Sequence, residues 1–366
     1  MKFNGKQRNA LFFIGVVSVF LTVIYILIAD TSTNPSSAES DNKHVAYQFR
    51  NQSIFSTEFY AEKIEELGMH ETYKLLAEIV EDMDDYGKHL NAHQFGDALY
   101  WKKTLGGIVV CDNRFGNGCF HQLFMTALNE EGENIILRVG KACLKEFGTG
   151  VEGHACNHGI GHGIMAALGE DLERALNACN LLESKEGFFA CIDGVFMEYF
   201  TPTLLVAEKN TPKTRELNIN NPDAACVSLD PKFQPTCYSM QVSWWLTRDM
   251  GAEKSGSWCE NIANRNNSEA CFRGLGYALV LSSRYQKDIV VQKCDEATDI
   301  MEKKILCRAG AYWGFKKGEE VGEKLSEEDK ALCEIEEKKR CLEEVEFMGT
   351  GIGISAICCS SSPELL

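Results

Sequence analysis

Residues 143–168 read CLKEFGTGVEGHACNHGIGHGIMAAL, and this segment shows the unit from which most of the chain is built. Cys143 lies in a charged, amphipathic stretch, a short glycine-containing turn follows, and Cys156 opens an apolar stretch rich in glycine. Six further cysteine pairs repeat the arrangement, and their second cysteines return after 37, 35, 46, 34, 36 and 34 residues. A period of this size between amphipathic segments is typical of stacked helical hairpins.

The cysteines are expected to form one disulfide per hairpin. Five of the seven pairs are 11 to 13 residues apart, which matches the end of one helix, a turn and the start of the next. Structural zinc sites and thioredoxin-like sites need two cysteines three positions apart, and the sequence has no such pair. The expected disulfides are Cys111/Cys119, Cys143/Cys156, Cys179/Cys191, Cys226/Cys237, Cys259/Cys271, Cys294/Cys307 and Cys333/Cys341.

The pattern predicts an all-α fold of disulfide-stapled helical-hairpin repeats. The second helix of each hairpin is expected to begin at its cysteine and to form an inner layer, with the more charged first helices outside. Glycine recurs three positions after the second cysteine, at Gly159, Gly194, Gly274 and Gly310. Because glycine destabilises a helix interior by about 1 kcal/mol relative to alanine, we expect a neighbouring helix to pack closely there. An open solenoid and a closed α/α toroid both fit this pattern.

The N-terminus predicts a membrane anchor. Residues 10–29 form an uncharged, mostly apolar run of 20 residues, long enough to cross a hydrocarbon core of about 30 Å. Lys2, Lys6 and Arg8 precede it, which favours a cytoplasmic head at residues 1–9 and export of the rest. A cleaved signal peptide is the alternative, although its apolar region is normally about 7–15 residues long. We therefore expect a single-pass membrane protein with most of the chain outside the cytoplasm, where disulfides persist.

The remaining organisation follows from composition and charge. Residues 30–56 are rich in serine, threonine and asparagine and predict a flexible linker, residues 57–357 the helical-repeat ectodomain, and residues 358–366 a C-terminal tail. The adjacent Cys358 and Cys359 have no assigned partner. A net charge of −16 argues against nucleic acid as a partner.

Five of the eight histidines recur in equivalent positions and predict a metal site. Two of them, His158 and His162, are four residues apart and therefore share one helical face. If successive second helices stack in register, imidazoles and carboxylates from four helices converge. Such donors suit Zn, Cu, Fe or Ni. The candidate ligands are His89, His93, His121, His158, His162, Asp193 and Glu198.

A structural interpretation of these residues remains open at this point. Each histidine could bond a backbone carbonyl of the next repeat, or the group could form a pH-responsive surface. His154 precedes the cysteine and is expected in the turn, as a peripheral candidate; His44 and His70 are not expected to take part.

Two resemblances add to this interpretation. The cysteine-stapled hairpins between Cys111 and Gly353 resemble exported, cysteine-rich members of the Sel1/TPR-like repeat class, which implies a helical-repeat fold. Separately, HLNAHQFGDALY, GCFHQLF, CNHGIGHGIM and GVFMEY resemble a family of microbial proteins with HxxxH and CxHGxGHG motifs. That likeness implies no mechanism.

Two functions from different classes follow. The first is a membrane-anchored, extracytoplasmic protein with a histidine/carboxylate metal site, either hydrolytic or redox. The second is a non-catalytic scaffold that presents a concave surface to an envelope protein, a peptide or a glycan. Aromatic residues at the helical positions of Trp244, Trp245, Tyr277, Tyr312 and Trp313 are usually core, but on a concave face they would form a contact platform. The sequence lacks a Walker A loop, a GxSxG elbow and an HExxH motif.

Overall fold

The computed structural model describes residues 54–349 except 170, 201–220, 222, 247–249, 284, 317–330 and 335. Within these ranges the chain is helical and contains no strand, in agreement with the predicted all-α class. The longer helices are α2 (Thr57–Leu67), α3 (Met69–Ile79), α4 (Asp85–Lys103), α5 (Gly118–Glu131), α6 (Ile136–Phe147), α7 (Val151–Ala167), α8 (Leu172–Ala178), α9 (Lys185–Phe200), α12 (Gln234–Leu246), α13 (Gly251–Asn261), α14 (Arg265–Ser282), α15 (Lys287–Ala297), α16 (Met301–Lys316) and α18 (Lys338–Gly349). Shorter elements are α11 (Ala224–Val227) and the 3-10 turns η1 (Thr104–Val110), η2 (Arg114–Asn117), η3 (Glu133–Ile135), η4 (Cys179–Leu181) and η5 (Ala331–Cys333).

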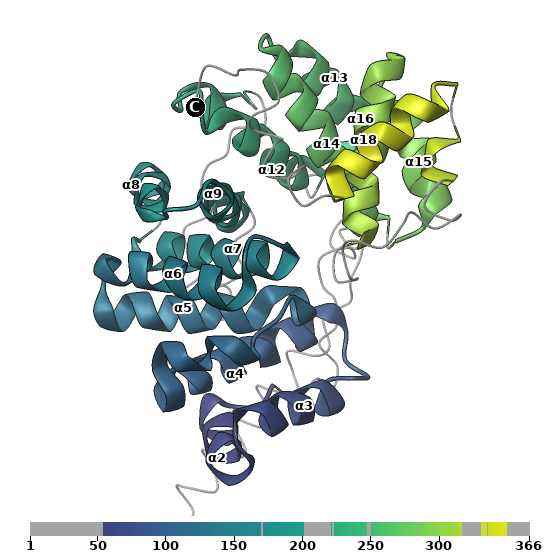
Figure 1. Cartoon of the computed structure of the whole chain (residues 1–366). Helices are drawn as coiled ribbons and strands as arrows, with labels where there is room; N and C mark the ends of the chain where they lie inside the picture. Colours follow the sequence, from purple (N-terminus) through teal and green to yellow (C-terminus); the bar gives the residue numbers. More distant parts are fainter. Residues whose placement is uncertain are drawn as a thin grey trace, which may run out of the picture. The chain divides into compact units, whose positions relative to one another are not determined.

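The second helices of the hairpins pack against one another in chain order. Helix α4 contacts α5, α5 contacts α7, α7 contacts α9, and the series continues through α12, α14, α16 and α18. The first helices α6, α8, α13 and α15 each pack against the second helix that follows them. Figure 1 shows the succession α4, α5, α7 and α9 as neighbouring helices. These contacts fit the expected hairpin repeats, whereas the choice between solenoid and toroid stays a prediction.

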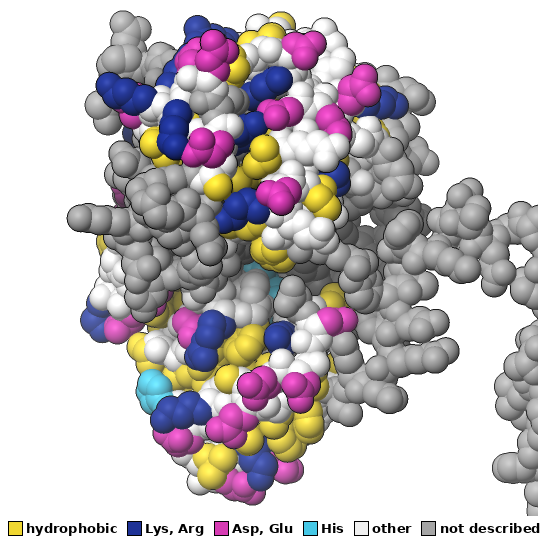
Figure 2. Space-filling view, turned by 90° about the vertical axis from the view of Figure 1, so that its right-hand side faces the viewer, with side chains coloured by type: hydrophobic (Ala, Val, Ile, Leu, Met, Phe, Trp, Pro, Cys, Tyr) yellow, Lys and Arg dark blue, Asp and Glu magenta, His cyan; other side chains and the backbone are white. Residues whose placement is uncertain are grey.

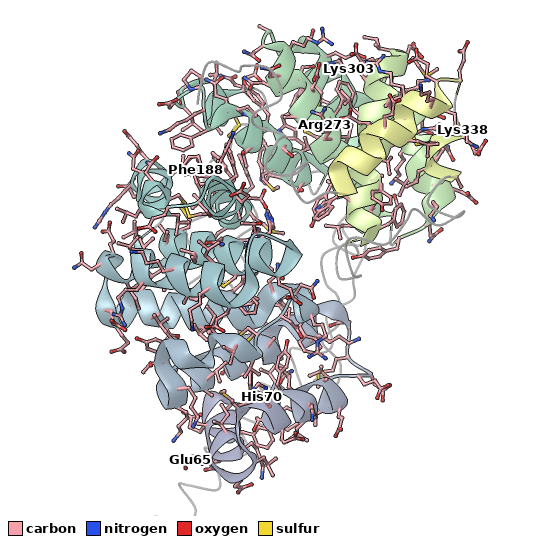
Figure 3. All side chains as sticks on the ribbon, in the orientation of Figure 1. Glu65, His70, Phe188, Arg273, Lys303 and Lys338 are labelled. Carbon is pink, nitrogen blue, oxygen red and sulfur yellow. A yellow bond between two sulfur atoms is a disulfide. The ribbon has the colours of Figure 1, made fainter. Side chains whose placement is uncertain are left out.

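The structure joins all seven expected cysteine pairs, and disulfides are visible among the side chains of Figure 3. The bridges are Cys111–Cys119, Cys143–Cys156, Cys179–Cys191, Cys226–Cys237, Cys259–Cys271, Cys294–Cys307 and Cys333–Cys341. Their Cα atoms are 5.5 to 5.8 Å apart, which is the separation that an ordinary disulfide requires. Each bridge ties the end of the first segment of a hairpin to the second helix of the same hairpin, so the predicted pairing is confirmed. Cys358 and Cys359 lie outside the described residues.

The second helices begin earlier than predicted. The expectation that each of them opens at its cysteine is wrong in all seven hairpins. Helix α5 begins one residue before its cysteine, and α12 and α18 begin three residues before theirs. Helix α7 begins five residues before its cysteine, and α9, α14 and α16 begin six residues before theirs. In chain order, the cysteines of α5, α7, α9, α12, α14, α16 and α18 are Cys119, Cys156, Cys191, Cys237, Cys271, Cys307 and Cys341. Each disulfide therefore attaches within the first two turns of its second helix, because there the helix passes close to the end of the preceding segment. As a consequence His154 is helical and does not lie in a turn.

Glycines set the distance between successive second helices. A Cβ atom added to Gly194 of α9 would lie 2.0 Å from the carbonyl oxygen of His158, and one on Gly310 would lie 1.9 Å from that of Arg273. A Cβ atom added to Gly274 would lie 2.1 Å from the carbonyl oxygen of Ser239. Real Cβ atoms do not approach a backbone that closely. The predicted packing role of these glycines is confirmed.

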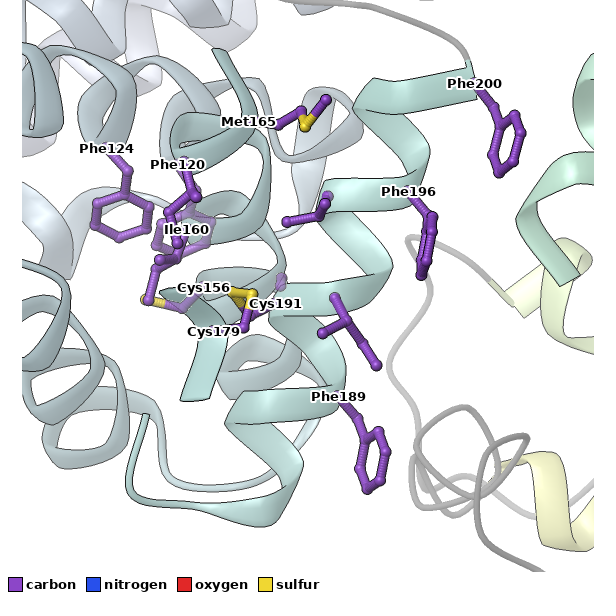
Figure 4. Close-up of a cluster of buried hydrophobic side chains, with 14 of the residues drawn as sticks. Phe120, Phe124, Cys156, Ile160, Met165, Cys179, Phe189, Cys191, Phe196 and Phe200 are labelled. Carbon is purple, nitrogen blue, oxygen red and sulfur yellow. A yellow bond between two sulfur atoms is a disulfide. The ribbon is translucent and has the colours of Figure 1, made fainter. Parts of the chain in front are cut away.

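The core between α5, α7 and α9 is apolar and aromatic. Phe120 and Phe124 of α5 face Ile160 of α7, and Phe196 of α9 is also fully buried (Figure 4). In the second half of the chain the buried aromatic side chains include Trp244, Trp245 and Tyr312, and Trp245 packs edge-on against Trp258. These three aromatic side chains are core residues, as expected for such helical positions, and they do not form the alternative binding platform.

The described surface carries charges of both signs. Figure 2 shows Lys and Arg interspersed with Asp and Glu on the face in view. No helix among the described residues is long and apolar enough to span a bilayer. The predicted anchor at residues 10–29 and most of the linker lie outside the described residues.

A glycine substitution tests the packing of the second helices away from the histidines. In Gly276→Ala the new Cβ would lie 1.7 Å from the carbonyl oxygen of Cys307, so α14 and α16 must separate. We expect the free energy of unfolding to fall by about 1–3 kcal/mol, measured by urea denaturation of the oxidised protein. Gly106→Ala is the matched control, because a Cβ there meets no atom within 4 Å. Equal stability of the two variants would contradict the close-packing interpretation.

Candidate metal centre

Four consecutive helices of the row bring the histidines together. Helix α4 carries His89 and His93, α5 carries His121, α7 carries His158 and His162, and α9 carries Asp193 and Glu198. The four-residue spacing places each histidine pair on one face of its helix. The glycines at the helix contacts then bring these faces within hydrogen-bond distance of one another. A Cβ on Gly161 of α7, for example, would lie 2.0 Å from the carbonyl oxygen of Cys191 in α9.

Two carboxylates of α9 fix the rings of α7. The Nδ1 atom of His158 lies 3.0 Å from Oδ2 of Asp193, and the Nδ1 atom of His162 lies 2.8 Å from Oε2 of Glu198. Since an ionised carboxylate only accepts hydrogen bonds, both Nδ1 atoms carry the hydrogen and donate it. In each neutral imidazole the lone pair is therefore on Nε2. A carboxylate behind Nδ1 is the arrangement that orients metal-ligating histidines.

The two Nε2 atoms of this pair face each other at 3.1 Å. Two lone pairs at this separation repel unless a proton or a cation lies between or beside them. Two nitrogens bound to one ion at about 2.0–2.1 Å lie roughly 2.9–3.4 Å apart when the angle at the ion is between octahedral and tetrahedral. The observed spacing of His158 and His162 therefore suits a shared ion without rearrangement.

His121 completes a group of three. Its ring stacks on that of His162 with centroids 4.0 Å apart, and His121, His158 and His162 each offer a ligand atom within 4.8 Å of the others. Neither ring nitrogen of His121 has a hydrogen-bond partner among the described residues, although the side chain is buried. A buried polar atom without a partner costs about 1–3 kcal/mol. Such an atom is expected where a ligand supplies the missing bond.

A second group of three also contains His121. His89, His93 and His121 also offer ligand atoms within 4.8 Å of one another, and the rings of His89 and His93 are 4.3 Å apart. The Nδ1 atom of His89 lies 2.7 Å from the carbonyl oxygen of Phe115, so it donates its hydrogen there and the lone pair is on Nε2. His93 is fully buried, and both of its ring nitrogens lack a partner within the described part of the chain.

The turn that presents the Phe115 carbonyl is conformationally strained. Phe115, Gly116 and Asn117 have φ angles of 54°, 62° and 64°, which is the left-handed region that non-glycine residues avoid. A Cβ on Gly116 would lie 3.2 Å from Nδ1 of His89, so glycine leaves room for the ring. Strained backbone of this kind concentrates at functional sites.

The electrostatics of the site favour neutral imidazoles. Burial lowers the pKa of His93 well below its usual value, and the positive charge of His89 and His162 when protonated lowers this pKa further. Burial likewise lowers the pKa of His121, with the neighbouring His162, His89, His158 and His93 adding to the effect. Neutral imidazole is the form that binds metal ions.

All seven predicted ligand candidates therefore lie in one continuous cluster, five as possible first ligands and Asp193 and Glu198 behind two of them. His154, expected as a peripheral candidate, lies at the edge of this cluster. Its Nε2 atom lies 3.8 Å from Oδ2 of Asp193, and His154, His158 and Asp193 form a third possible ligand group. Its position four residues before His158 was the available signal. The acceptor at Phe115 is a backbone atom, which no motif reveals. His70 is exposed on α3, and Figure 3 labels it there.

No family model, curated protein or solved structure matches this chain. The site is therefore interpreted from its own geometry.

The low pKa values of His93 and His121 predict that the metal-free protein loses stability in acid. Both residues stay neutral in the folded state but take up protons in the unfolded state below about pH 6.5, so the unfolded state binds more protons there. We expect the free energy of unfolding of chelator-treated protein to be constant above pH 7 and to fall below pH 6.5 by up to about 1.4 kcal/mol per pH unit for each residue. Urea denaturation between pH 5 and 8 measures this dependence. His121→Gln should reduce the slope, whereas exposed His70→Gln should not.

Proposed function

We propose that this chain is a membrane-anchored, extracytoplasmic metalloprotein whose helical-repeat domain binds a transition-metal ion between His121, His158 and His162. The observation that carries the proposal is the 3.1 Å approach of the two Nε2 atoms of His158 and His162, each with its Nδ1 hydrogen committed to a carboxylate. A proton between the two nitrogens relieves their repulsion as well. It does not supply a partner to either buried nitrogen of His121, whereas a metal ion supplies one to one of them.

The donor set indicates which ions suit the site. Imidazole nitrogens with carboxylates behind them suit Zn, Cu or Fe, and argue against Mg and Ca, which prefer oxygen ligands. Asp193 and Glu198 would act through the histidines, because one oxygen of each already accepts a hydrogen bond from Nδ1 of His158 or His162. Their charge stabilises the cation and raises the basicity of the ligating rings.

Burial bears on the chemistry that such an ion can perform. Four residues of the site are almost completely buried: His121, His158, His162 and Glu198. Among the described residues, this burial keeps a polymeric substrate away from any open coordination position on the ion. Hydrolysis of a peptide or glycan requires such a position. Burial therefore supports electron transfer or chemistry on a small molecule over hydrolysis.

The proposed location follows from two other features. Seven disulfides at ordinary Cα separations require an oxidising compartment to persist. The apolar run at residues 10–29 provides the proposed anchor, and the lysines and arginine before it favour a cytoplasmic N-terminus.

Metal content tests the proposal directly. After expression in metal-replete medium and purification without chelators, we expect elemental analysis to find at least one equivalent of a transition metal per chain. His158→Gln/His162→Gln removes the facing Nε2 pair, so the metal of this group should be lost while the far-UV circular dichroism spectrum and the disulfides persist.

His70→Gln is the matched control, since it changes an exposed histidine outside the cluster. Less than about a tenth of an equivalent in the wild-type protein, after reloading with Zn, Cu and Fe in turn, would overturn the metal proposal. The rival function, a disulfide-rigid binding scaffold, would then be favoured.

A second prediction concerns the carboxylate behind His162. Glu198→Gln keeps the side-chain shape but removes the charge and the purely accepting character of the group. We expect the dissociation constant for Zn²⁺, measured by competition with a chromophoric chelator, to rise about 10–100-fold. Glu173→Gln, at an exposed position on α8, is the control and should leave the constant unchanged. Equal affinities would mean that Glu198 serves the fold and not the ion.

A further inference from the structure

The five histidines contain two ligand groups that share one residue, and this arrangement points beyond a single ion. His121, His158 and His162 form the first group, and His89, His93 and His121 form the second. We infer that the centre binds two metal ions and that His121 is a ligand of both. This inference rests on the proposed metal-binding function and extends it.

The unpartnered nitrogens require two ions. His93 and His121 together have four ring nitrogens that are buried and lack hydrogen-bond partners among the described residues. The two lone-pair directions of one imidazole diverge, so a single ion cannot bind both nitrogens of a ring. An ion in the first group therefore takes one nitrogen of His121 and leaves the other, together with His93, without a partner. A second ion between His89, His93 and His121 binds the remaining nitrogen of His121 and one nitrogen of His93, so that three of the four nitrogens have a partner.

The second group shares one feature with the first, an acceptor that fixes the tautomer of a ring. In the first group, acceptors on α9 hold the Nδ1 hydrogens of His158 and His162 and so place their lone pairs on Nε2. In the second group, the carbonyl oxygen of Phe115 accepts the Nδ1 hydrogen of His89 at 2.7 Å and so places the lone pair of this ring on Nε2. This carbonyl belongs to the strained left-handed turn. His89 and His93 are one helical turn apart on α4, with ring centroids 4.3 Å from each other. Each group thus contains one or two rings of fixed tautomer and the common ring of His121.

The ring of His121 lies near rings of both groups. Its centroid is 4.0 Å from that of His162 and 5.3 Å from that of His89. Gly118 and Gly159 permit this position, because a Cβ on Gly118 would lie 2.8 Å from the carbonyl oxygen of His89 and one on Gly159 would lie 2.8 Å from Cβ of Phe120. Helix α5 can therefore lie close to both α4 and α7, and its histidine reaches both groups.

Binding of two ions to His121 requires the loss of one proton from its ring. Neutral His121 carries one N–H hydrogen and one lone pair, so it can ligate the first ion without change. Binding of the second ion at the other nitrogen displaces the N–H proton to water and leaves an imidazolate between two dications. No electron is transferred in this step. His89 is only half buried, which places the partly exposed edge of the cluster at the second group.

Zinc stoichiometry of the full chain tests the second ion. We expect equilibrium dialysis against Zn²⁺, followed by elemental analysis, to give two equivalents for the wild type, one for His93→Gln and one for His158→Gln. His70→Gln should keep two. One equivalent in both the wild type and His93→Gln would overturn the second site but leave the proposed function intact, whereas no bound zinc, copper or iron in the wild type would overturn both.

Copper tests the sharing of His121. An imidazolate between two Cu²⁺ ions couples their unpaired electrons, so the integrated electron paramagnetic resonance signal of the wild type should rise with the first equivalent and fall as the second binds. His93→Gln should retain the signal of a single copper ion. A signal that rises in proportion to copper up to two equivalents would show two independent ions and would overturn the bridging role. Because the wild type alone gives this result, misfolding of a variant cannot obscure it.

Discussion

The close approach of successive second helices is the constraint on which the rest of this structure depends. At the contact between α7 and α9, Gly161 and Gly194 each face a carbonyl oxygen of the partner helix that a Cβ would strike at 2.0 Å. Glycine weakens each helix, but packing of the two backbones more than offsets that cost. The same arrangement recurs between α12 and α14, at Gly274, and between α14 and α16, at Gly276 and Gly310.

The histidine cluster follows from this constraint. The close approach of α7 and α9 brings the imidazoles of one helix within direct hydrogen-bond distance of the carboxylates of the other. The carbonyl of His158 is the one that meets Gly194, and the ring of the same histidine reaches Asp193 at 3.0 Å. Wider helix separation would leave the rings apart, and water would then satisfy their nitrogens. Close packing therefore both assembles the ligands and removes their alternative partners.

The disulfides and the cluster place different demands on the same hairpins. Each disulfide joins two segments within a hairpin, whereas the hydrogen bonds of the cluster run between hairpins. A disulfide between cysteines 12 or 13 residues apart restricts the unfolded chain. In the loop-closure description this stabilises the folded state by roughly 3 kcal/mol. That stabilisation acts against the cost of burying polar nitrogens at His93 and His121. A fold with fixed hairpins can tolerate such a site.

The sequence by itself predicted the helical class, the seven cysteine pairs and the seven ligand candidates. All three follow from the spacing at which residue types repeat along the chain. It did not determine where α7 begins, and so it placed His154 in a turn. It left two roles open for Trp244, Trp245 and Tyr312, core or binding platform, and the packing buries them. Only the tertiary structure decided that Nδ1 of His162 meets Glu198, that Nδ1 of His89 meets the Phe115 carbonyl, and that the facing Nε2 atoms are 3.1 Å apart. These features depend on the rotation and separation of neighbouring helices, which residue spacing within one helix does not encode.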